Sequence, residues 1–318
     1  MKDQMQYKEV SVDIGWGKVR GKIWQTGTEN SCDLKIVALH GWVDNCNSFQ
    51  PLIPHITEGA TLLAIDLPGH GLSDHLPKGA RYDHLVNVFS LKTLLDKLNW
   101  KSVVLLAHSY GVLAAVWFSA LFPDLVSGLI TMDLLFPWDT KSWKKDWASE
   151  IYGHLKFDKL KGDKSPKIYS EKEIIEISIA SRVTGLARED ASVAEDAARV
   201  LLERGTKQHK DGYIWTHDPK ASRMTLWTLF GLDNYFHVIS NLKCPFLVIM
   251  SSHGEMLPLK ITEEEVNTRN HLREEFFQHA PNCMYHEVQG SHHVHLTKPH
   301  RVAPLICEFI RTIKNTES

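Results

Sequence analysis

The sequence predicts an α/β protein with a mostly parallel sheet of about eight strands, helices on both faces and an inserted helical segment. Three observations lead to this prediction. Short apolar runs without polar alternation recur along the chain, as is typical of buried parallel strands. Helical patterns lie between these runs, and such β-then-α repetition indicates a parallel sheet. About a hundred residues of charged, helical, strand-poor sequence then interrupt the alternation.

The expected strands fall into three groups. The first two alternate apolar and polar residues, which favours an antiparallel hairpin with one face in water. The next four are short and apolar without alternation, as strands covered on both faces should be. The last two follow the interrupting segment, where the strand pattern resumes. The expected strands are 10–14, 19–24, 36–39, 62–65, 103–106, 129–132, 246–250 and 284–288. The expected helices between and after them are 47–57, 84–98, 110–122, 263–279 and 300–314.

The interrupting segment is expected to form a cap, residues 137–236, over a core made of residues 1–136 and 237–318. Its expected helices are 140–155, 171–184, 189–204 and 219–232. We place the cap over the carboxyl edge of the sheet, because open α/β sheets bind ligands at that edge. The cap is rich in aromatic residues, and we expect Trp138, together with Trp42 of the core, to line an apolar substrate pocket.

The composition limits the classes of function. The chain has 318 residues, of which 43% are hydrophobic and 23% charged, which is ordinary for a globular protein. Its formal net charge of −2 argues against a nucleic-acid partner, which would require a basic surface. Five scattered cysteines without a CxxC pair are expected to be reduced thiols.

No targeting or membrane segment is evident in the sequence. The first ten residues lack the apolar stretch of a secretory signal, and no run approaches the roughly 18 apolar residues of a membrane span. We therefore expect a cytoplasmic protein without integral membrane association, with peroxisomal or vesicle-associated placement as the alternatives.

Residues 107–111 read Ala-His-Ser-Tyr-Gly and lie between an expected strand and an expected helix. This arrangement is what a strand–nucleophile–helix elbow needs, since small flanking residues would permit a sharp turn that exposes the Ser109 hydroxyl. Ala107 stands where the usual G-x-S-x-G pattern has glycine, and we interpret it as a tolerated change. The backbone N–H of Tyr110 would then donate to an oxyanion. The alternative is that Ser109 only caps the helix.

A serine nucleophile needs a base, and in this chain order the base comes last. The segment 290–299 contains His292, His293 and His295 and follows the last expected strand. A metal site built from these three histidines is disfavoured, because adjacent side chains diverge and no carboxylate or cysteine lies nearby at ligand spacing. We therefore expect neither a metal nor a cofactor.

Four segments taken together resemble the α/β-hydrolase fold family over nearly the whole chain. They are His40-Gly41-Trp42, the segment 66–74 (DLPGHGLSD), the Ser109 elbow and the histidine segment. The segments 201–206 and His253-Gly254 are similar, more narrowly, to the animal serine hydrolase-like proteins. The resemblance implies that the backbone N–H groups of Trp42 and Tyr110 form an oxyanion hole, and that His40 and His70 are structural.

The resemblance also implies a role for one particular histidine. The family's catalytic histidine is commonly followed by histidine and leucine at +3 and +4 and by proline at +7. His292 fits this register through His295, Leu296 and Pro299, whereas His293 and His295 do not. We therefore expect His292 to be the base.

The resemblance leaves two candidates for the acid that orients this base. The family usually places the acid just after the strand that is here 246–250, where Glu255 is the nearby carboxylate. Some members place it after an earlier strand, and Asp133 directly follows 129–132. We prefer Asp133 and keep Glu255 as the alternative.

A serine nucleophile forms acyl-enzymes, so the resemblance implies a carboxylesterase-like hydrolase acting on small to medium apolar carboxylic esters. Two other functions remain open. The first is a non-hydrolytic Ser/His enzyme of the same fold, such as a C–C hydrolase, a lyase or a cofactor-free oxygenase. The second is a catalytically degenerate ligand-binding protein, which the lack of an aspartate at the usual acid position suggests.

Overall fold

A computed structural model describes residues 5–27, 34–136, 152–153, 155–156, 166–181, 191–222, 231–254 and 263–317. In this part of the chain, eight strands form one sheet in the order β1-β2-β4-β3-β5-β6-β9-β10. The β1–β2 and β2–β4 pairs are antiparallel, and every other pair is parallel. The strands are β1 (Tyr7–Asp13), β2 (Lys18–Thr26), β3 (Lys35–Leu39), β4 (Ala60–Ile65), β5 (Val103–His108), β6 (Val126–Met132), β9 (Phe246–His253) and β10 (Met284–Ser291). The predicted mostly parallel sheet is confirmed.

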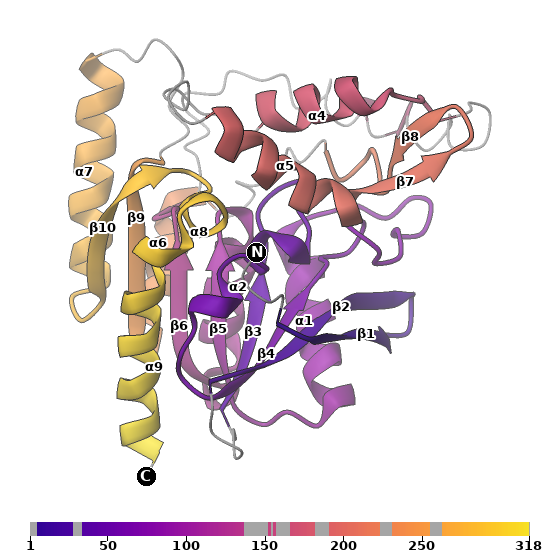
Figure 1. The fold of residues 1–318 in the computed structure, drawn as a ribbon. Helices are drawn as coiled ribbons and strands as arrows, with labels where there is room; N and C mark the ends of the chain where they lie inside the picture. Colours follow the sequence, from indigo (N-terminus) through magenta and orange to yellow (C-terminus); the bar gives the residue numbers. More distant parts are fainter. Residues whose placement is uncertain are drawn as a thin grey trace.

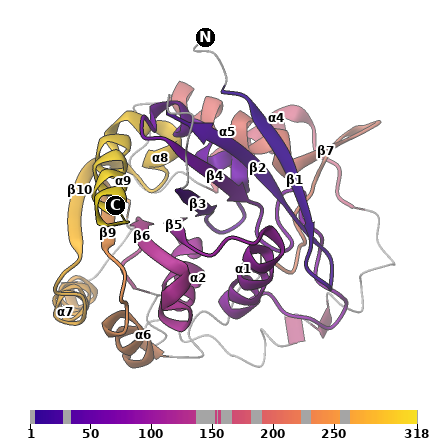
Figure 2. The ribbon, with the colours of Figure 1, turned by 90° about the horizontal axis from the view of Figure 1, so that it is seen from below.

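Helices cover both faces of this sheet (Figure 2). On one face lie α1 (His84–Leu98), α2 (Tyr110–Leu121), α6 (Gly231–Ser240) and α7 (Glu263–His279). On the other face lie η1 (Cys46–Phe49), η2 (Ile53–His55), α8 (Val294–Thr297), η5 (Pro299–Arg301) and α9 (Ala303–Glu317). A last short turn, η3 (Pro123–Leu125), joins α2 to β6. None of the described helices is both long enough and apolar enough for a membrane crossing.

The two faces have separate hydrophobic cores because side chains alternate along each strand. On β3, Val37 and Leu39 join the core beneath α1 and α2, whereas Ile36 and Ala38 join the core beneath α9. Every residue of β4 and β5 is buried, which explains why these strands read as continuous apolar runs.

The described elements of the expected cap segment 137–236 before α6 are α4 (Glu171–Ala180), α5 (Ala191–Gly205) and a hairpin of β7 (Thr206–His209) and β8 (Gly212–Trp215), and we refer to these elements and residues 216–222 as the cap. Figure 1 shows these elements above one end of the sheet. Ile174, Ile175 and Leu202 give the cap a small apolar cluster of its own. The β7–β8 hairpin was not expected, because its strands are only four residues long and half-buried.

Two expected helices differ from the structure. The segment 47–57 contains two short 3-10 turns, η1 and η2, because Pro51 and Pro54 lack the N–H groups that a continuous helix needs. In the expected helix 219–232, residues 219–222 form a turn, 231–232 belong to α6, and 223–230 lie outside the described residues. The Asp218 side chain accepts a hydrogen bond from the Lys220 N–H, which favours the turn over a helix.

The expected boundary between cap and core, at 236/237, falls inside α6. Tyr235 and Phe236 are buried in the same core as α2, and the Tyr235 hydroxyl donates to the carbonyl of Leu135 at 3.0 Å. By these contacts α6 packs with the core. Of the expected helix 140–155, only 152–153 and 155 lie within the described residues.

Candidate active site

The elbow at Ser109 joins β5 directly to α2. Ser109 has φ 49° and ψ −120°, a left-handed conformation that non-glycine residues avoid. Its N–H donates to the Met132 carbonyl, and its own carbonyl accepts from the Val112 N–H, both at 2.9 Å. A Cβ at Gly111 would collide with the Leu39 carbonyl oxygen, so this position requires glycine. The backbone bonds thus hold a strained turn that projects the Ser109 side chain from the end of β5.

His292 bridges this serine to a carboxylate. Its Nε2 lies 2.8 Å from the Ser109 Oγ, and its Nδ1 lies 2.5 Å from the Asp133 Oδ2. Because a carboxylate only accepts hydrogen bonds, Nδ1–H donates to Asp133, and Nε2 is left to accept from the Ser109 hydroxyl. All three residues are buried. The arrangement can take a proton from Ser109 and stabilise the resulting imidazolium.

The carboxylate of Asp133 is held from two sides. One oxygen faces His292, and the other accepts from the N–H of Ser251 at 2.8 Å and from its hydroxyl at 2.6 Å. A Cβ at Gly254 would overlap this carboxylate and the Ser251 hydroxyl. The family usually carries its acid at the end of the strand that is here β9. In this chain that end supplies two hydrogen-bond donors from Ser251, and the lack of a side chain at Gly254 makes room for the Asp133 carboxylate, which follows β6.

Sequence reasoning missed Ser251 and Gly254 as parts of this site. Two features of the sequence could have pointed to this part of the site. No aspartate follows 246–250, and the pair His253-Gly254 resembles the serine hydrolase-like proteins. The alternative acid, Glu255, lies outside the described residues.

Trp42 and Tyr110 lie beyond the carboxyl ends of β3 and β5, which are parallel neighbours in the sheet. Tyr110 is the first residue of α2, so its N–H belongs to the helix end that carries partial positive charge and favours an anion. The loop that carries Trp42 is held by His40, whose Nδ1–H donates to the Gly41 carbonyl and whose Nε2 accepts from the Leu67 N–H. His40 therefore shapes this loop.

The indole of Trp42 connects the core to the cap. Its Nε1–H donates to the Ala221 carbonyl at 2.9 Å, while 40% of the residue stays exposed. The expected pocket residue Trp138 lies outside the described residues.

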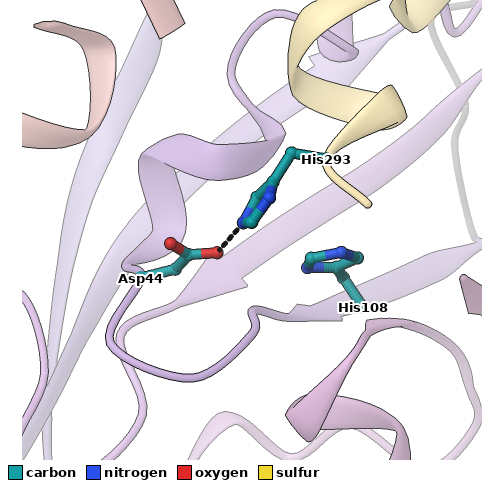
Figure 3. A group of neighbouring side chains, drawn as sticks. All are labelled: Asp44, His108 and His293. Atoms are coloured by element: carbon teal, nitrogen blue, oxygen red, sulfur yellow. Dashed lines mark hydrogen bonds and ion pairs between the residues drawn. The ribbon is translucent and has the colours of Figure 1, made fainter. Parts of the chain in front are cut away.

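Three further histidines lie behind the elbow, and burial lowers the pKa of two of them. The pKa of His108 is well below its ordinary value, and that of His295 is about 3. His293 instead faces a carboxylate, with its Nε2 3.1 Å from the Asp44 Oδ2 across 249 residues of sequence. Local spacing could not indicate this carboxylate, which joins His293 and His108 in one cluster (Figure 3).

A buried ion pair fastens α5 of the cap to the core. Arg204 donates from Nε to the Asp66 Oδ2 at 2.6 Å, and its Nη1 contacts Glu9 at 2.9 Å. Asp66 is fully buried and also accepts from the N–H groups of Cys46 and Leu72. The segment 201–206, singled out in the sequence, thus contains a link between cap and core.

Comparisons with known proteins agree with the fold described above. A sequence profile described as alpha/beta hydrolase fold matches residues 36–158. A "Probable serine hydrolase" of Drosophila melanogaster is 32% identical over 310 residues, which cover 96% of this chain and 88% of that protein. The chain belongs to the α/β-hydrolase fold family. "Serine hydrolase-like protein 2" of Homo sapiens is 26% identical to this α/β hydrolase, over 95% of this chain and 94% of that protein.

Solved structures resemble this α/β hydrolase over nearly its whole length. A hypothetical protein from Pseudomonas aeruginosa PAO1 has a TM-score of 0.75 at 21% identity, over 97% of this chain and 99% of that one. The thioesterase domain from the curacin biosynthetic pathway has a TM-score of 0.72 at 18% identity, over 95% and 99%. At these identities the likeness shows a shared fold.

Proposed function

We propose that this α/β hydrolase is a serine esterase that cleaves small to medium apolar carboxylic esters through an acyl-enzyme. The observation that carries the proposal is the continuous hydrogen-bonded line from the Ser109 Oγ through the His292 ring to the Asp133 carboxylate, with separations of 2.8 and 2.5 Å. Ser109 is the nucleophile, His292 the base and Asp133 the acid that orients it.

In the first half-reaction, the Ser109 Oγ attacks the ester carbonyl carbon as the His292 Nε2 takes the hydroxyl proton. Asp133 stabilises the imidazolium that forms. The backbone N–H groups of Trp42 and Tyr110 donate to the carbonyl oxygen as it becomes negative, and each such donor typically contributes about 2.7–4 kcal/mol to the transition state. The intermediate then collapses, and His292 passes its proton to the departing alkoxide, which leaves as the alcohol.

In the second half-reaction, water takes the place of the alcohol. His292 removes a proton from this water, whose oxygen attacks the acyl carbon of the Ser109 ester. Collapse of the second intermediate breaks the bond to the Ser109 Oγ, and His292 returns the proton to that oxygen. A carboxylic acid leaves and the starting enzyme is restored, so the cycle consumes only ester and water.

Two features support this class of substrate. A serine at the elbow forms an ester with an acyl group, which suits carbonyl substrates. Trp42, whose backbone N–H is proposed to hold the oxyanion, also places a large, part-exposed aromatic side chain between the core and the cap. The degenerate-binder alternative is weakened because Asp133 occupies the position of an acid, although the β9 end carries none among its described residues.

Labelling with a fluorophosphonate probe, combined with hydrolysis of p-nitrophenyl esters of increasing acyl length, tests the proposal. We expect wild type to label and to hydrolyse short and medium esters, and Ser109→Ala to do neither. Ser102→Ala, an exposed serine just before β5, is the matched control and should behave as wild type. Hydrolysis that persists in Ser109→Ala, or wild type that neither labels nor hydrolyses, would overturn the proposal.

The choice of acid has its own test. Asp133→Asn should lower kcat by about 10⁴-fold, as loss of the orienting carboxylate does in other serine triads. Glu255→Gln should leave kcat within a few-fold of wild type. The opposite result would assign the acid to Glu255.

A further inference from the structure

We infer that Asp44, His108 and His293 form a binding site for a divalent transition-metal ion, with zinc as the best fit. One ligand atom from each residue lies within 4.8 Å of the other two, and all three residues are buried. They come from three separate segments: the loop before η1, the end of β5 and the turn before α8. Figure 3 shows the Asp44 carboxylate directed toward both imidazole rings.

His108 is oriented as a metal ligand should be. Its Nε2 lies 2.8 Å from the His292 carbonyl oxygen, which can only accept, so Nε2 carries the hydrogen and Nδ1 carries the lone pair. That Nδ1 is buried and has no hydrogen-bond partner among the described residues. Metal-binding histidines commonly donate their other ring N–H to a carbonyl in this way, because the bond fixes the tautomer.

Gly41 borders two of the ligand atoms. A Cβ at this position would lie 2.9 Å from the His108 Nδ1 and 3.2 Å from the Asp44 Oδ2. Both distances are shorter than ordinary van der Waals contact, so glycine keeps side-chain atoms from pressing on these two ligands.

The separations suit zinc with a small adjustment. The Asp44 Oδ2 and the His293 Nε2 are 3.1 Å apart, close to the about 3.3 Å that separates two ligands of one tetrahedral zinc. The ligand atoms of the three residues lie at most 4.8 Å apart, so bringing any pair to a separation of about 3.3 Å requires a movement of at most about 1.5 Å. Two imidazoles and one carboxylate are ligands that zinc prefers, whereas magnesium and calcium prefer oxygen alone.

Asp44 also borders a small cavity at the boundary between cap and core, together with Val43, Asn45, Leu201 and Trp215. This is the side from which we propose that the ion and a water ligand reach Asp44.

An ion at this site would disturb the proposed catalytic residues, and this consequence rests on the proposed function. His108 donates to the His292 carbonyl, His293 directly follows the base, and Gly41 precedes the proposed oxyanion residue Trp42. Drawing the ligands together therefore shifts the backbone on both sides of Ser109. We expect zinc to inhibit ester hydrolysis and a chelator to restore it.

Zinc titration of the full-length Ser109→Ala protein against a chromogenic zinc indicator tests binding without relying on activity. We expect one tight zinc per chain, and at least a tenfold weaker affinity in Asp44→Asn and in His293→Gln. His271→Gln, an exposed histidine on α7, is the matched control and should bind as the parent does. His292→Gln should also retain binding, which separates this site from the triad. Circular dichroism without zinc verifies that each variant is folded.

The outcomes separate the two proposals. Unchanged affinity in both Asp44→Asn and His293→Gln, or loss of binding in His292→Gln alone, would overturn the metal site. Zinc that binds as expected but leaves wild-type ester hydrolysis intact would overturn only the inhibition. If wild type hydrolyses no ester, the proposed function fails, while the titration still decides the site.

Discussion

The Asp133 carboxylate has a partner on each oxygen, His292 on one side and Ser251 on the other. Its left-handed φ of 58° is held by its N–H, which donates to the Ile249 carbonyl on β9. The side chain that orients the base is therefore itself oriented by a neighbouring strand. Such support fixes a catalytic geometry more firmly than the triad residues alone would.

Substitutions at the end of β9 should impair catalysis although they replace none of the three proposed triad residues. Gly254→Ala adds a Cβ that collides with the Asp133 carboxylate, so we expect kcat to fall by more than about 100-fold with little change in KM. Ser251→Ala removes one of two donors and should lower kcat by about tenfold. Kinetics on the best ester measure both effects, with exposed Ser252→Ala as the control. Wild-type kcat in Gly254→Ala would show that this contact does not position the acid.

His70 should make the folded state less stable in acid. Burial, followed by the nearby His40, lowers its pKa from 6.5 to about 3. At pH values between these two pKa values, His70 is protonated in the unfolded chain but neutral in the folded protein. The free energy of unfolding therefore falls as the pH drops below 6.5. Each such histidine contributes up to about 1.4 kcal/mol per pH unit.

Urea unfolding at pH 6.5, 5.5 and 4.5 measures this effect. His70→Asn keeps a donor for the Pro68 carbonyl but has no imidazole, so its stability should depend less steeply on pH than that of wild type. The exposed His271→Asn should leave the slope unchanged. Equal slopes for His70→Asn and wild type would contradict the lowered pKa.

Residues that depend on local pattern could be predicted from the sequence, and those that depend on distant pairing could not. Ser109 and His292 were chosen because each sits in a short segment with its own spacing. The choice between Asp133 and Glu255 depends on how the ends of β6 and β9 lie in the sheet, which no local pattern encodes. Asp44 and His293 are 249 residues apart in the sequence, so no local spacing around either residue predicts their contact.

At the scale of elements, the central strands are the most predictable part, because burial of β4 and β5 on both faces leaves continuous apolar sequence. The errors lie where tertiary contacts decide the backbone. Residues 219–222 form a turn because Asp218 binds within the turn and also donates its N–H to the Gly69 carbonyl. The residues of the β7–β8 hairpin are half-buried or exposed and none is fully buried, so its sequence lacks the apolar alternation of a typical hairpin.

The link between α5 and the core should contribute strongly to stability. Arg204→Met leaves the fully buried Asp66 without its counter-ion, and we expect the free energy of unfolding to fall by about 3 kcal/mol. Glu9→Gln affects a partner that is half exposed and should cost less than about 1 kcal/mol. Urea unfolding measures both variants. Equal losses for the two would show that burial of Asp66 does not govern the link.

Considered as a whole, the molecule joins cap to core through several polar contacts in addition to the apolar cluster of Leu76, Tyr82 and Ala221. Asn45 and Asn47 donate to the Leu201 and Val200 carbonyls of α5, and Trp42 donates to the Ala221 carbonyl. Asp218 is buried and accepts from the Tyr82 hydroxyl at 3.0 Å. Polar links of this kind open more readily than an apolar interface, so these segments are where local opening should occur.

Removing one of these links should loosen residues 216–222 selectively. Tyr82→Phe deletes the hydroxyl that donates to Asp218 and accepts from the Leu76 N–H, a loss of about 1–3 kcal/mol. Hydrogen exchange in 216–222 should accelerate by about five- to 100-fold, while amides of α9 keep their protection. Tyr285→Phe, on the distant strand β10, is the control. Uniform acceleration across the chain would instead indicate global destabilisation.

The proposed nucleophile Ser109 and the proposed acid Asp133 both belong to one β5–α2–β6 unit in the middle of the sheet. The proposed base His292 follows β10, which lies at the margin of the described sheet and pairs there only with β9. The register of β10 is already irregular between Val288 and Ser291, just before His292. If β10 separates from β9 at this edge, the His292 ring would move away from Ser109 while the strands at the centre of the sheet stay paired. We therefore expect warming to disrupt the proposed catalytic arrangement through the edge strand β10 before the centre of the sheet unfolds, and a cross-link between β10 and β9 to delay that loss.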